Sequence, residues 1–311
     1  MTAASPAELV LGAVQLGLPY GAANRTGQPS RTQALRLVHQ AVEAGITAFD
    51  TARAYGESEL RLGEALSGKK AVRTVTKLSP LSELAPDASR QAARAAVDAS
   101  IAASLAALQC DHLDCLLLHR AAHMTSHGGA IWERLIERLE DGSVLALGVS
   151  VQSPAEALAA LDCHDVVHIQ MPFNILDQRW REAGVIDKIR ARAHVTIHVR
   201  SVFLQGVLAA NDPSVWPQVP GVDVLALVDL IAELTRAFGR KSPADLCLAY
   251  ARGQDWVDGV VVGMETEDQL DTNLRLFVRP PLSREDCAAI AARVPALPAA
   301  LLDPAQWPKK T

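Results

Sequence analysis

The stretch ITAFDTARAYG, residues 46–56, decides the fold and the chemistry that we expect. Its apolar part, 46–49, is typical of a short buried strand, and Asp50 follows where that strand ends. Tyr55 comes soon afterwards, in a loop bounded by Gly56. Two more polar residues end later strand-like runs: Lys77 follows 72–76, and His119 follows 113–118. A carboxylate, a phenol, an ammonium and an imidazole from three successive strand ends predict a proton-transfer site.

Outward from this stretch, short apolar runs alternate with longer amphipathic segments along the chain. We expect eight strands, over 9–14, 46–49, 72–76, 113–118, 144–149, 166–169, 195–199 and 257–262. Helices are expected over 30–44, 58–66, 88–108, 130–140, from 154 onward, and over 180–193, 224–238, 243–251 and 267–276. Ser30 and Ser153 are the expected N-caps of two of these helices.

Strands that alternate with helices predict an α/β protein with a parallel sheet. Eight such units, without Gly-x-Gly-x-x-Gly after the first strand, favour a (β/α)8 TIM barrel over a doubly wound dinucleotide-binding sheet. No linker-like segment divides the 311 residues, and their 49% hydrophobic content suits one large core. We therefore expect a single domain over 1–311, with 283–311 as a helix and tail packed outside the barrel.

Charge and cysteine content restrict the partners. The net charge is −5 and the basic residues are scattered, which gives no sign of a nucleic-acid surface or a polybasic membrane patch. Residues 1–8 lack a basic region, and no apolar run approaches the roughly twenty residues that span a bilayer, so a cytoplasmic protein is expected. The five cysteines lack metal-binding spacing, which argues against a metal site or a disulfide framework. The oligomeric state is not indicated.

Three further polar residues stand at predicted strand ends. Ser150 closes the fifth strand, Gln170 the sixth and Arg200 the seventh. Active-site residues of (β/α)8 barrels lie at the C-terminal ends of the strands. We therefore expect these three side chains to share one mouth with the proton-transfer site.

At these positions the chain resembles the aldo-keto reductases, nicotinamide-dependent oxidoreductases built on this barrel. The resemblance runs from about residue 11 to 273 and rests on the 50–56 motif, Lys77, Leu-Leu-Leu-His at 116–119, Gly-Val-Ser at 148–150 and Gln170, in the family's order. It implies that NAD(P)H and a small-molecule aldehyde or ketone are the ligands, and that the chain interconverts this carbonyl compound and its alcohol.

The resemblance also implies a role for each member of the proton-transfer site. Tyr55 would be the general acid that protonates the carbonyl oxygen. Lys77 would stabilise the phenolate, and Asp50 would fix Lys77 while bordering the cofactor. His119 would donate a hydrogen bond to the substrate oxygen and so orient and polarise the carbonyl.

Binding residues follow from the same resemblance. Ser150 and Gln170 match positions that hold the nicotinamide carboxamide, and Asn273 matches one that contacts the adenine end. The remaining matches are backbone beside the cofactor and one residue of the substrate mouth: Gly17, Leu18 and Tyr20.

Two departures from the family pattern concern the nicotinamide end. Val151 stands where asparagine is usual, so one amide contact to the nicotinamide would be missing. Arg200 stands where many members carry a tyrosine that stacks on the nicotinamide ring. Its planar guanidinium could stack there as well, or it could bind an anionic group of the substrate.

A third departure lies after the eighth strand. Many members that prefer NADP carry a lysine and an arginine there for the 2'-phosphate, whereas this chain has Gly263 and Gln269, with Glu265 between them. The loss of two cations and the gain of a carboxylate are expected to weaken binding of a dianionic phosphate. The sequence therefore suggests that NADH is used at least as well as NADPH.

Each residue alone also has a structural interpretation. An aspartate after a strand is often a turn residue, Arg200 could form an ion pair at the rim, and Glu265 could be a first-turn helix carboxylate. The alternative function is a nicotinamide-binding regulatory or redox-sensor protein on the same barrel, similar to the potassium-channel β subunits. The complete four-residue set favours chemistry over this alternative. For the substrate, Arg53 and Arg200 near the mouth would suit a sugar or an acidic aldehyde.

Overall fold

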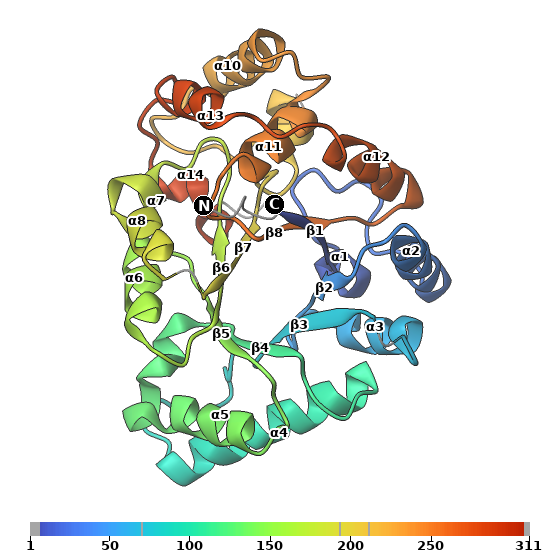
Figure 1. The fold of residues 1–311 in the computed structure, drawn as a ribbon, viewed down its shortest axis with the longest axis vertical. Helices are drawn as coiled ribbons and strands as arrows, with labels where there is room; N and C mark the ends of the chain where they lie inside the picture. Colours follow the sequence, from blue (N-terminus) through green and yellow to red (C-terminus); the bar gives the residue numbers. More distant parts are fainter. Residues whose placement is uncertain (1–6, 70, 193, 211, 308–311) are drawn as a thin grey trace.

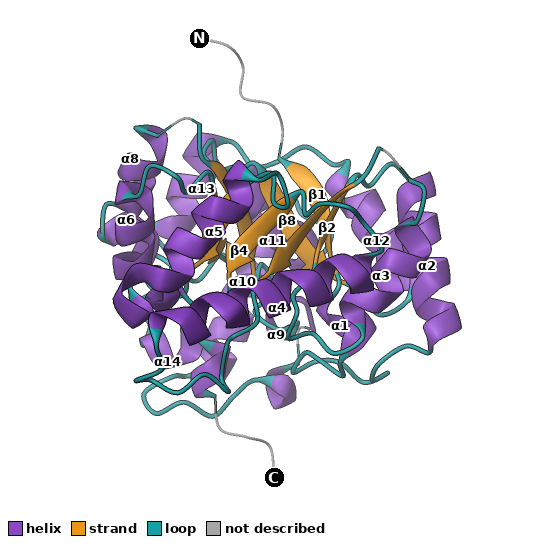
Figure 2. Cartoon of the chain, turned by 90° about the horizontal axis from the view of Figure 1, so that it is seen from below, coloured by secondary structure: helices purple, strands orange, loops and turns teal. Residues whose placement is uncertain are grey.

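The computed structural model describes residues 7–69, 71–192, 194–210 and 212–307. Eight parallel strands pair in chain order and close into a barrel. Helices surround it as an outer ring (Figures 1 and 2). The predicted (β/α)8 barrel is therefore confirmed. Position 193, where one expected helix ends, and the tail beyond 307 lie outside the described residues.

Each of the eight predicted runs overlaps one strand of the barrel. The strands are β1 (Glu8–Gly12), β2 (Ala48–Asp50), β3 (Arg73–Lys77), β4 (Cys115–Leu118), β5 (Leu147–Ser150), β6 (His168–Pro172), β7 (Thr196–Arg200) and β8 (Gly259–Gly263). Predicted and observed ends differ by a few residues, because apolar side chains continue into the turns.

Helices connect the strands and cover the outside of the barrel. They are α1 (Val14–Gly17), α2 (Arg31–Glu43), α3 (Ser58–Leu66), α4 (Arg90–Leu108), α5 (Ala130–Glu140), α6 (Pro154–Asp162), α7 (Arg179–Glu182), α8 (Val185–Arg190), α9 (Val207–Ala210), α10 (Val224–Ala237), α11 (Pro243–Arg252), α12 (Glu267–Phe277), α13 (Arg284–Ala291) and α14 (Ala299–Leu302). Short 3-10 turns add η1 (Ala121–Met124), η2 (Ser126–Gly129), η3 (Pro213–Val215) and η4 (Pro304–Gln306).

Local sequence explains the starts of α2 and α6. Ser30 and Gln33 form a reciprocal capping box at α2, and Ser153 and Glu156 form one at α6, where Pro154 is the first helical residue. Both predicted N-caps are confirmed. Each box satisfies backbone N–H groups that would otherwise lack partners at the helix start.

Two predicted elements are wrong in detail. The helix expected over 180–193 is two short helices, α7 and α8, because Gly184 adopts a left-handed conformation with φ of +72° and interrupts it. The first strand ends at Gly12 rather than at 14, since Val14 begins α1. This earlier end places Gln15 at the mouth of the barrel.

Alternation along the strands explains why polar groups gather at one end. Val10, Ala48 and Val261 pack together as a small cluster apart from the main core, and Val75 forms a second one. Side chains two residues apart on a strand face the same side. Two residues beyond this layer, which is apolar on most strands and carries His168 and His198 on β6 and β7, the same inner face presents Gly12, Asp50, Lys77, His119, Ser150, Gln170, Arg200 and Gly263.

Candidate active site

A buried ion pair forms the floor of the barrel mouth. Lys77, at the end of β3, donates from Nζ to Asp50 Oδ1 at 2.9 Å, to Asp50 Oδ2 at 2.8 Å and to the carbonyl oxygen of Thr51 at 2.7 Å. Lys77 is 1% exposed and Asp50 is 4% exposed. All three donors of the ammonium are thus used, and its charge is compensated by a carboxylate at contact distance.

Gln170 reaches the same carboxylate from the opposite side of the barrel. Its Nε2 donates to Asp50 Oδ2 at 2.6 Å, while its Oε1 is buried and has no hydrogen-bond partner among the described residues. Its Cα pairs in register with that of Ser150 on β5. The amide therefore holds Asp50 with one end and keeps a free acceptor at the other.

The turn after β2 places Tyr55 over the ion pair. Lys77 Nζ lies 5.0 Å from the centre of the Tyr55 ring. The Tyr55 carbonyl accepts from the Ser58 N–H at 3.0 Å, and a Cβ added to Gly17 would lie 1.8 Å from that same carbonyl oxygen. Because only glycine fits there, Gly17 lets α1 approach the turn that carries the phenol.

His119 packs against the phenol ring of Tyr55 in a T-shaped arrangement. The two rings are 5.8 Å apart between centroids and nearly perpendicular. Burial, followed by the nearby positive charges of Lys77 and Arg200, lowers the pKa of His119 to about 3. The imidazole is therefore neutral near neutral pH, and its buried Nδ1 has no partner in the described part of the chain.

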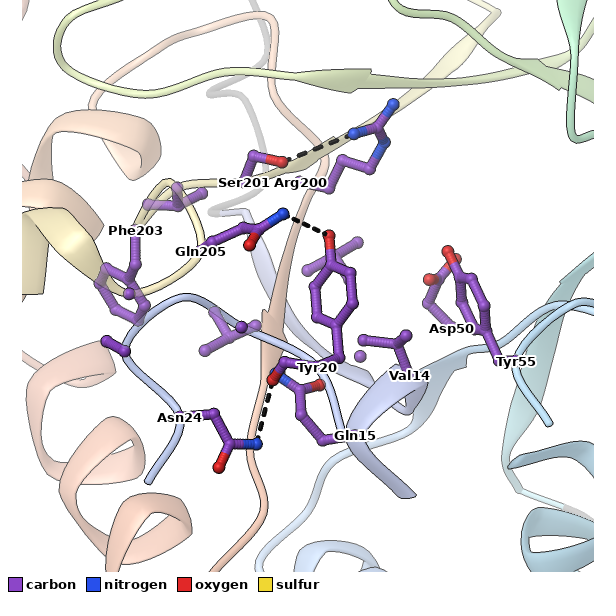
Figure 3. Close-up of a pocket in the computed structure, with 18 of the residues that line it drawn as sticks. Val14, Gln15, Tyr20, Asn24, Asp50, Tyr55, Arg200, Ser201, Phe203 and Gln205 are labelled. Atoms are coloured by element: carbon purple, nitrogen blue, oxygen red, sulfur yellow. Dashed lines mark hydrogen bonds between the residues drawn. The ribbon is translucent and has the colours of Figure 1, made fainter. Parts of the chain in front are cut away.

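These groups open into one large cavity at the C-terminal ends of the strands, with a volume of about 1030 Å³. Figure 3 shows Tyr20, with Gln205 at its hydroxyl, and Asp50 and Tyr55 among the residues drawn around it. Ten of the predicted site residues line the cavity: Tyr20, Asp50, Tyr55, His119, Ser150, Arg200, Gly263, Glu265, Gln269 and Asn273. Four do not: Gly17, Leu18, Lys77 and Gln170.

Comparison with known proteins identifies the family. The model of the Aldo/keto reductase family matches residues 8–294, which is most of the chain. The chain belongs to the aldo/keto reductase family.

Individual relatives agree with this membership. The 6-dehydroglucose reductase of Novosphingobium aromaticivorans is 35% identical over 136 residues, so the match spans 40% of this chain and 44%, less than half, of that relative. The holo form of aldo-keto reductase AKR11C1 from Bacillus halodurans is similar with a TM-score of 0.75 and 24% identity, over 93% of both chains. Its apo form gives 0.69 and 23%, over 92% of both chains. These two solved structures share the fold.

In this family member, the α12 end of the cavity is acidic. Glu265 Oε1 accepts from Gln269 Nε2 at 3.0 Å, and Gln269 Oε1 accepts from the Glu265 N–H at 2.9 Å. Asp268, in the first turn of α12, also lines the cavity, whereas Arg36 of α2 is paired with Glu267. Arg120 and Arg200 are the lysine or arginine residues on the lining, as far as the structure describes the chain.

Several cavity residues of this aldo/keto reductase family member are not marked by any sequence pattern. Gln15 was not predicted as a site residue; it lies in α1, lines the cavity, and its buried Oε1 has no partner among the described residues. Gln152 and Gln205 also line it. Both lie in loops, Gln152 after β5 and Gln205 after β7, where the sequence does not indicate whether a side chain faces the cavity.

The expectation that Arg53 serves an acidic substrate is wrong. Its guanidinium pairs with buried Glu59, which also accepts from the Thr76 hydroxyl at 2.7 Å, and Arg53 is not part of the cavity lining. Among the described residues, no group of three or more potential ligand side chains could hold a metal ion. None of the helices in that part of the chain is both long and apolar enough to span a membrane.

Proposed function

We propose that this chain catalyses hydride transfer between a nicotinamide cofactor and the carbonyl group of an aldehyde or ketone, with Tyr55 as the general acid. The observation that carries the proposal is the arrangement at the cavity floor. A compensated Lys77–Asp50 pair lies against the phenol ring, and neutral His119 packs nearly perpendicular to that ring. Family membership supports the same reaction class.

The residues of the cavity suit a nicotinamide. A carboxamide needs both a donor and an acceptor. Ser150 brings a hydroxyl to the cavity lining, and Gln170, which pairs with it in register but is not itself on the lining, has a buried Oε1 without a partner among the described residues. Gln15 offers a second buried acceptor at the same mouth. Ser150, Gln170 and Gln15 would therefore hold this end of the cofactor, and Asn273 the other. The reduced nicotinamide, when bound, supplies the hydride.

Proton delivery is assigned to Tyr55. A free phenol has a pKa of about 10 and is a poor acid near neutrality, so its developing negative charge must be stabilised. The Lys77 ammonium, 5.0 Å from the ring centre, does this electrostatically. Asp50 acts through Lys77, which it fixes with two hydrogen bonds. Asp50 is thus a positioning residue for the proton transfer.

Substrate orientation is assigned to His119. A neutral imidazole carries one N–H, and this group can donate to the carbonyl oxygen without competing with Tyr55 for the proton. The lowered pKa of His119, caused first by burial, keeps the ring in this neutral form. A neutral donor preserves hydrogen bonding while avoiding a third cation beside Lys77 and Arg200.

For the substrate, we propose a sugar aldehyde or a related small carbonyl compound. The support is the partial match to a 6-dehydroglucose reductase. The cavity also offers polar groups suited to hydroxyls, including the phenol of Tyr20 and the amide of Gln205, which contact each other at 3.5 Å.

For the cofactor, we propose that NADH binds at least as well as NADPH. The α12 end carries Glu265 and Asp268, and the nearby Arg36 is already paired with Glu267. A 2'-phosphate would meet carboxylates there instead of cations. Dissociation constants from quenching of nicotinamide fluorescence test this. Binding of NADPH that is tighter than that of NADH by tenfold or more, about 1.4 kcal/mol, would contradict it.

An assay of the purified chain with NADH or NADPH and a panel of aldehydes, including aldose sugars, tests the proposed reaction. We expect oxidation of the cofactor that depends on the aldehyde. If the cofactor binds but none of the aldehydes accelerates its oxidation, the proposed reaction fails and the regulatory or sensor function becomes the better account.

A further inference from the structure

Arg200 sits at the end of β7 with its guanidinium held by neutral groups only. Its Nη2 donates to the backbone oxygen of Val151 at 3.2 Å and to Gln152 Oε1 at 2.8 Å. Its Nη1 lies 3.5 Å from the Ser201 hydroxyl oxygen, an interaction that Figure 3 shows. The residue is half-buried and lines the cavity. The rim ion pair considered from the sequence does not form, because no described carboxylate lies within 4 Å of this guanidinium.

A second chain segment, distant in sequence, fixes the amide that holds Arg200. Gln152 Nε2 donates to Asp303 Oδ1 at 2.9 Å. This interaction sets the orientation of the amide, so its oxygen faces Arg200 and its nitrogen faces Asp303. Asp303 itself caps η4 by accepting from the Ala305 N–H at 3.1 Å. The segment that carries α14 and η4 therefore reaches the cavity rim through one side chain.

The charge of Arg200 is left without compensation. Two neighbouring cations differ in this respect, because Lys77 has Asp50 and Arg53, outside the cavity lining, has Glu59. Arg120 also lines the cavity, but it is exposed to solvent. Burying a guanidinium without an anion costs free energy, and neutral acceptors recover only part of that cost. They also leave further N–H groups of the fork available. Such a cation is suited to receive an anion from the cavity.

The cation also lies near the reacting groups. Its charge helps to lower the pKa of His119, after burial and the charge of Lys77. Backbone geometry beside it is unusual, because Ser201 adopts a φ of +60°, a conformation that is rare for a residue with a side chain. Arg200 and His119 thus line the same cavity and are close enough for their charges to interact.

We propose that Arg200 binds an anionic substituent of the carbonyl substrate, a carboxylate or a phosphate, and that Gln152 and Asp303 aim its guanidinium. The inference rests on the proposed carbonyl reduction and narrows its substrate class. Arg200 is the binding group, whereas Gln152 and Asp303 are positioning residues that do not touch the substrate.

Matched substrate pairs test the binding role. Succinic semialdehyde with butanal, and glyceraldehyde 3-phosphate with glyceraldehyde, each differ by one anionic group; together the pairs distinguish a carboxylate from a phosphate. We expect kcat/KM of the native chain to favour the anionic member of at least one pair by about 10- to 100-fold, as for a hydrogen bond to a charged group. Most of this preference is expected in KM.

Variants at Arg200 locate the preference. Arg200→Met is expected to reduce the anionic-to-neutral ratio to about one, and Arg200→Lys, which keeps a point charge but loses the fork, to restore part of it. Arg120→Met is the matched control, since Arg120 also lines the cavity but is exposed. Arg120→Met should change the anionic-to-neutral ratio of kcat/KM by only about threefold, and this change should disappear at high salt.

A variant at Gln152 tests the aiming role. Gln152→Glu places a carboxylate against Arg200, so it is expected to abolish the anionic preference by compensating the charge, although Arg200 is still present. Gln152→Met removes the acceptor without adding charge and should lower the preference less. Thermal unfolding of each variant shows whether it is folded.

Three results would overturn the inference. One is that the native chain reduces the neutral aldehydes but shows an anionic-to-neutral ratio of kcat/KM near one for both substrate pairs. The proposed reaction would then still hold, and only the role of Arg200 would be rejected. Another is an anionic preference that survives Arg200→Met. The third is that Arg200→Met weakens NADH binding by the same factor as it lowers kcat/KM for the anionic substrate. The guanidinium would then bind the cofactor instead of the substrate. Absence of turnover with every aldehyde would instead reject the proposed reaction itself.

Discussion

Two cations at the mouth of the barrel have opposite surroundings. Lys77, at the end of β3, is 1% exposed and gives all three donors to a carboxylate and one backbone oxygen. Arg200, at the end of β7, is half-buried and meets only neutral acceptors. The partner of a buried cation at this mouth therefore indicates what the cation does. A compensated cation serves the internal machinery, and an uncompensated one is available to a ligand.

Removal of Lys77 is expected to cause the largest losses, both in kcat and in the free energy of unfolding. Lys77→Met leaves Asp50 buried without its cation and deprives Tyr55 of electrostatic support. We expect kcat to fall by about 10²- to 10⁴-fold, the range for general acid catalysis, and the free energy of unfolding to fall by about 3–5 kcal/mol. Steady-state kinetics and denaturant unfolding measure the two losses.

A neighbouring ion pair provides the control for that variant. Arg53→Met also removes the cation from a buried carboxylate, Glu59, but outside the cavity. It should lower stability while kcat of the folded fraction is retained. If Arg53→Met lost as much kcat as Lys77→Met, the kinetic loss would reflect damaged folding rather than a catalytic role of the lysine.

His119 is expected to show a smaller loss, together with a characteristic pH dependence. His119→Leu removes the proposed donor to the carbonyl and should lower kcat/KM by about 10²- to 10³-fold. Because the pKa of His119 is lowered to about 3, its protonation does not limit activity between about pH 5 and pH 8. The native chain and the variant should therefore share one pH profile there. An acidic limb near pH 6.5 in the native chain that the variant lacks would contradict this.

The smallest expected effect concerns two buried histidines, His168 and His198, at the opposite end of the barrel. His168 is buried against His198, with ring centroids 4.3 Å apart, and His198 lies 3.6 Å from Glu8, which also pairs with Arg73. Burial, followed by the charges of His198 and Lys77, lowers the pKa of His168 well below its ordinary value. This basic group is kept neutral instead of being compensated.

The direction in which stability changes with pH follows from the protonation of His168 in the folded and unfolded chain. Below about pH 6.5 the unfolded chain binds a proton at His168 that the folded chain does not, so stability falls as the pH drops through that value, by at most about 1.4 kcal/mol per pH unit for this group. Urea unfolding at about pH 7.5 and pH 5.5 measures the change. His168→Leu should show a shallower loss. An equal loss in both proteins would mean that other groups dominate.

The sequence predicted the parts of the molecule that depend on local pattern. Alternating strands and helices were enough for the barrel, and strand ends were enough to bring Asp50, Tyr55 and His119 to one cavity. The pairing of Lys77 with Asp50 was also predicted and is confirmed. The strand–helix alternation repeats in each unit, so a short window of sequence contains it, whereas the Lys77–Asp50 pairing joins two strands and was expected from the family resemblance.

Contacts between distant segments were not predictable in the same way. The bond from Gln152 to Asp303 joins residues 151 positions apart, and the bond from Gln170 to Asp50 crosses the barrel. No local pattern marks either partner. Arg53 is a different case, because its partner Glu59 is only six positions away. The sequence does not indicate whether this arginine of the 50–56 motif faces the cavity or a neighbouring carboxylate.

The most direct test of the proposed chemistry is the rate of NADH oxidation by Tyr55→Phe, measured beside its NADH dissociation constant. The chain has three tyrosines, which gives two controls: Tyr20→Phe alters another phenol of the cavity, and Tyr250→Phe alters a buried phenol that does not line it. We expect Tyr55→Phe to bind NADH like the native chain and to lose kcat by about 10²- to 10⁴-fold, while both controls lose far less. Retention of native turnover by Tyr55→Phe would contradict its assignment as the acid.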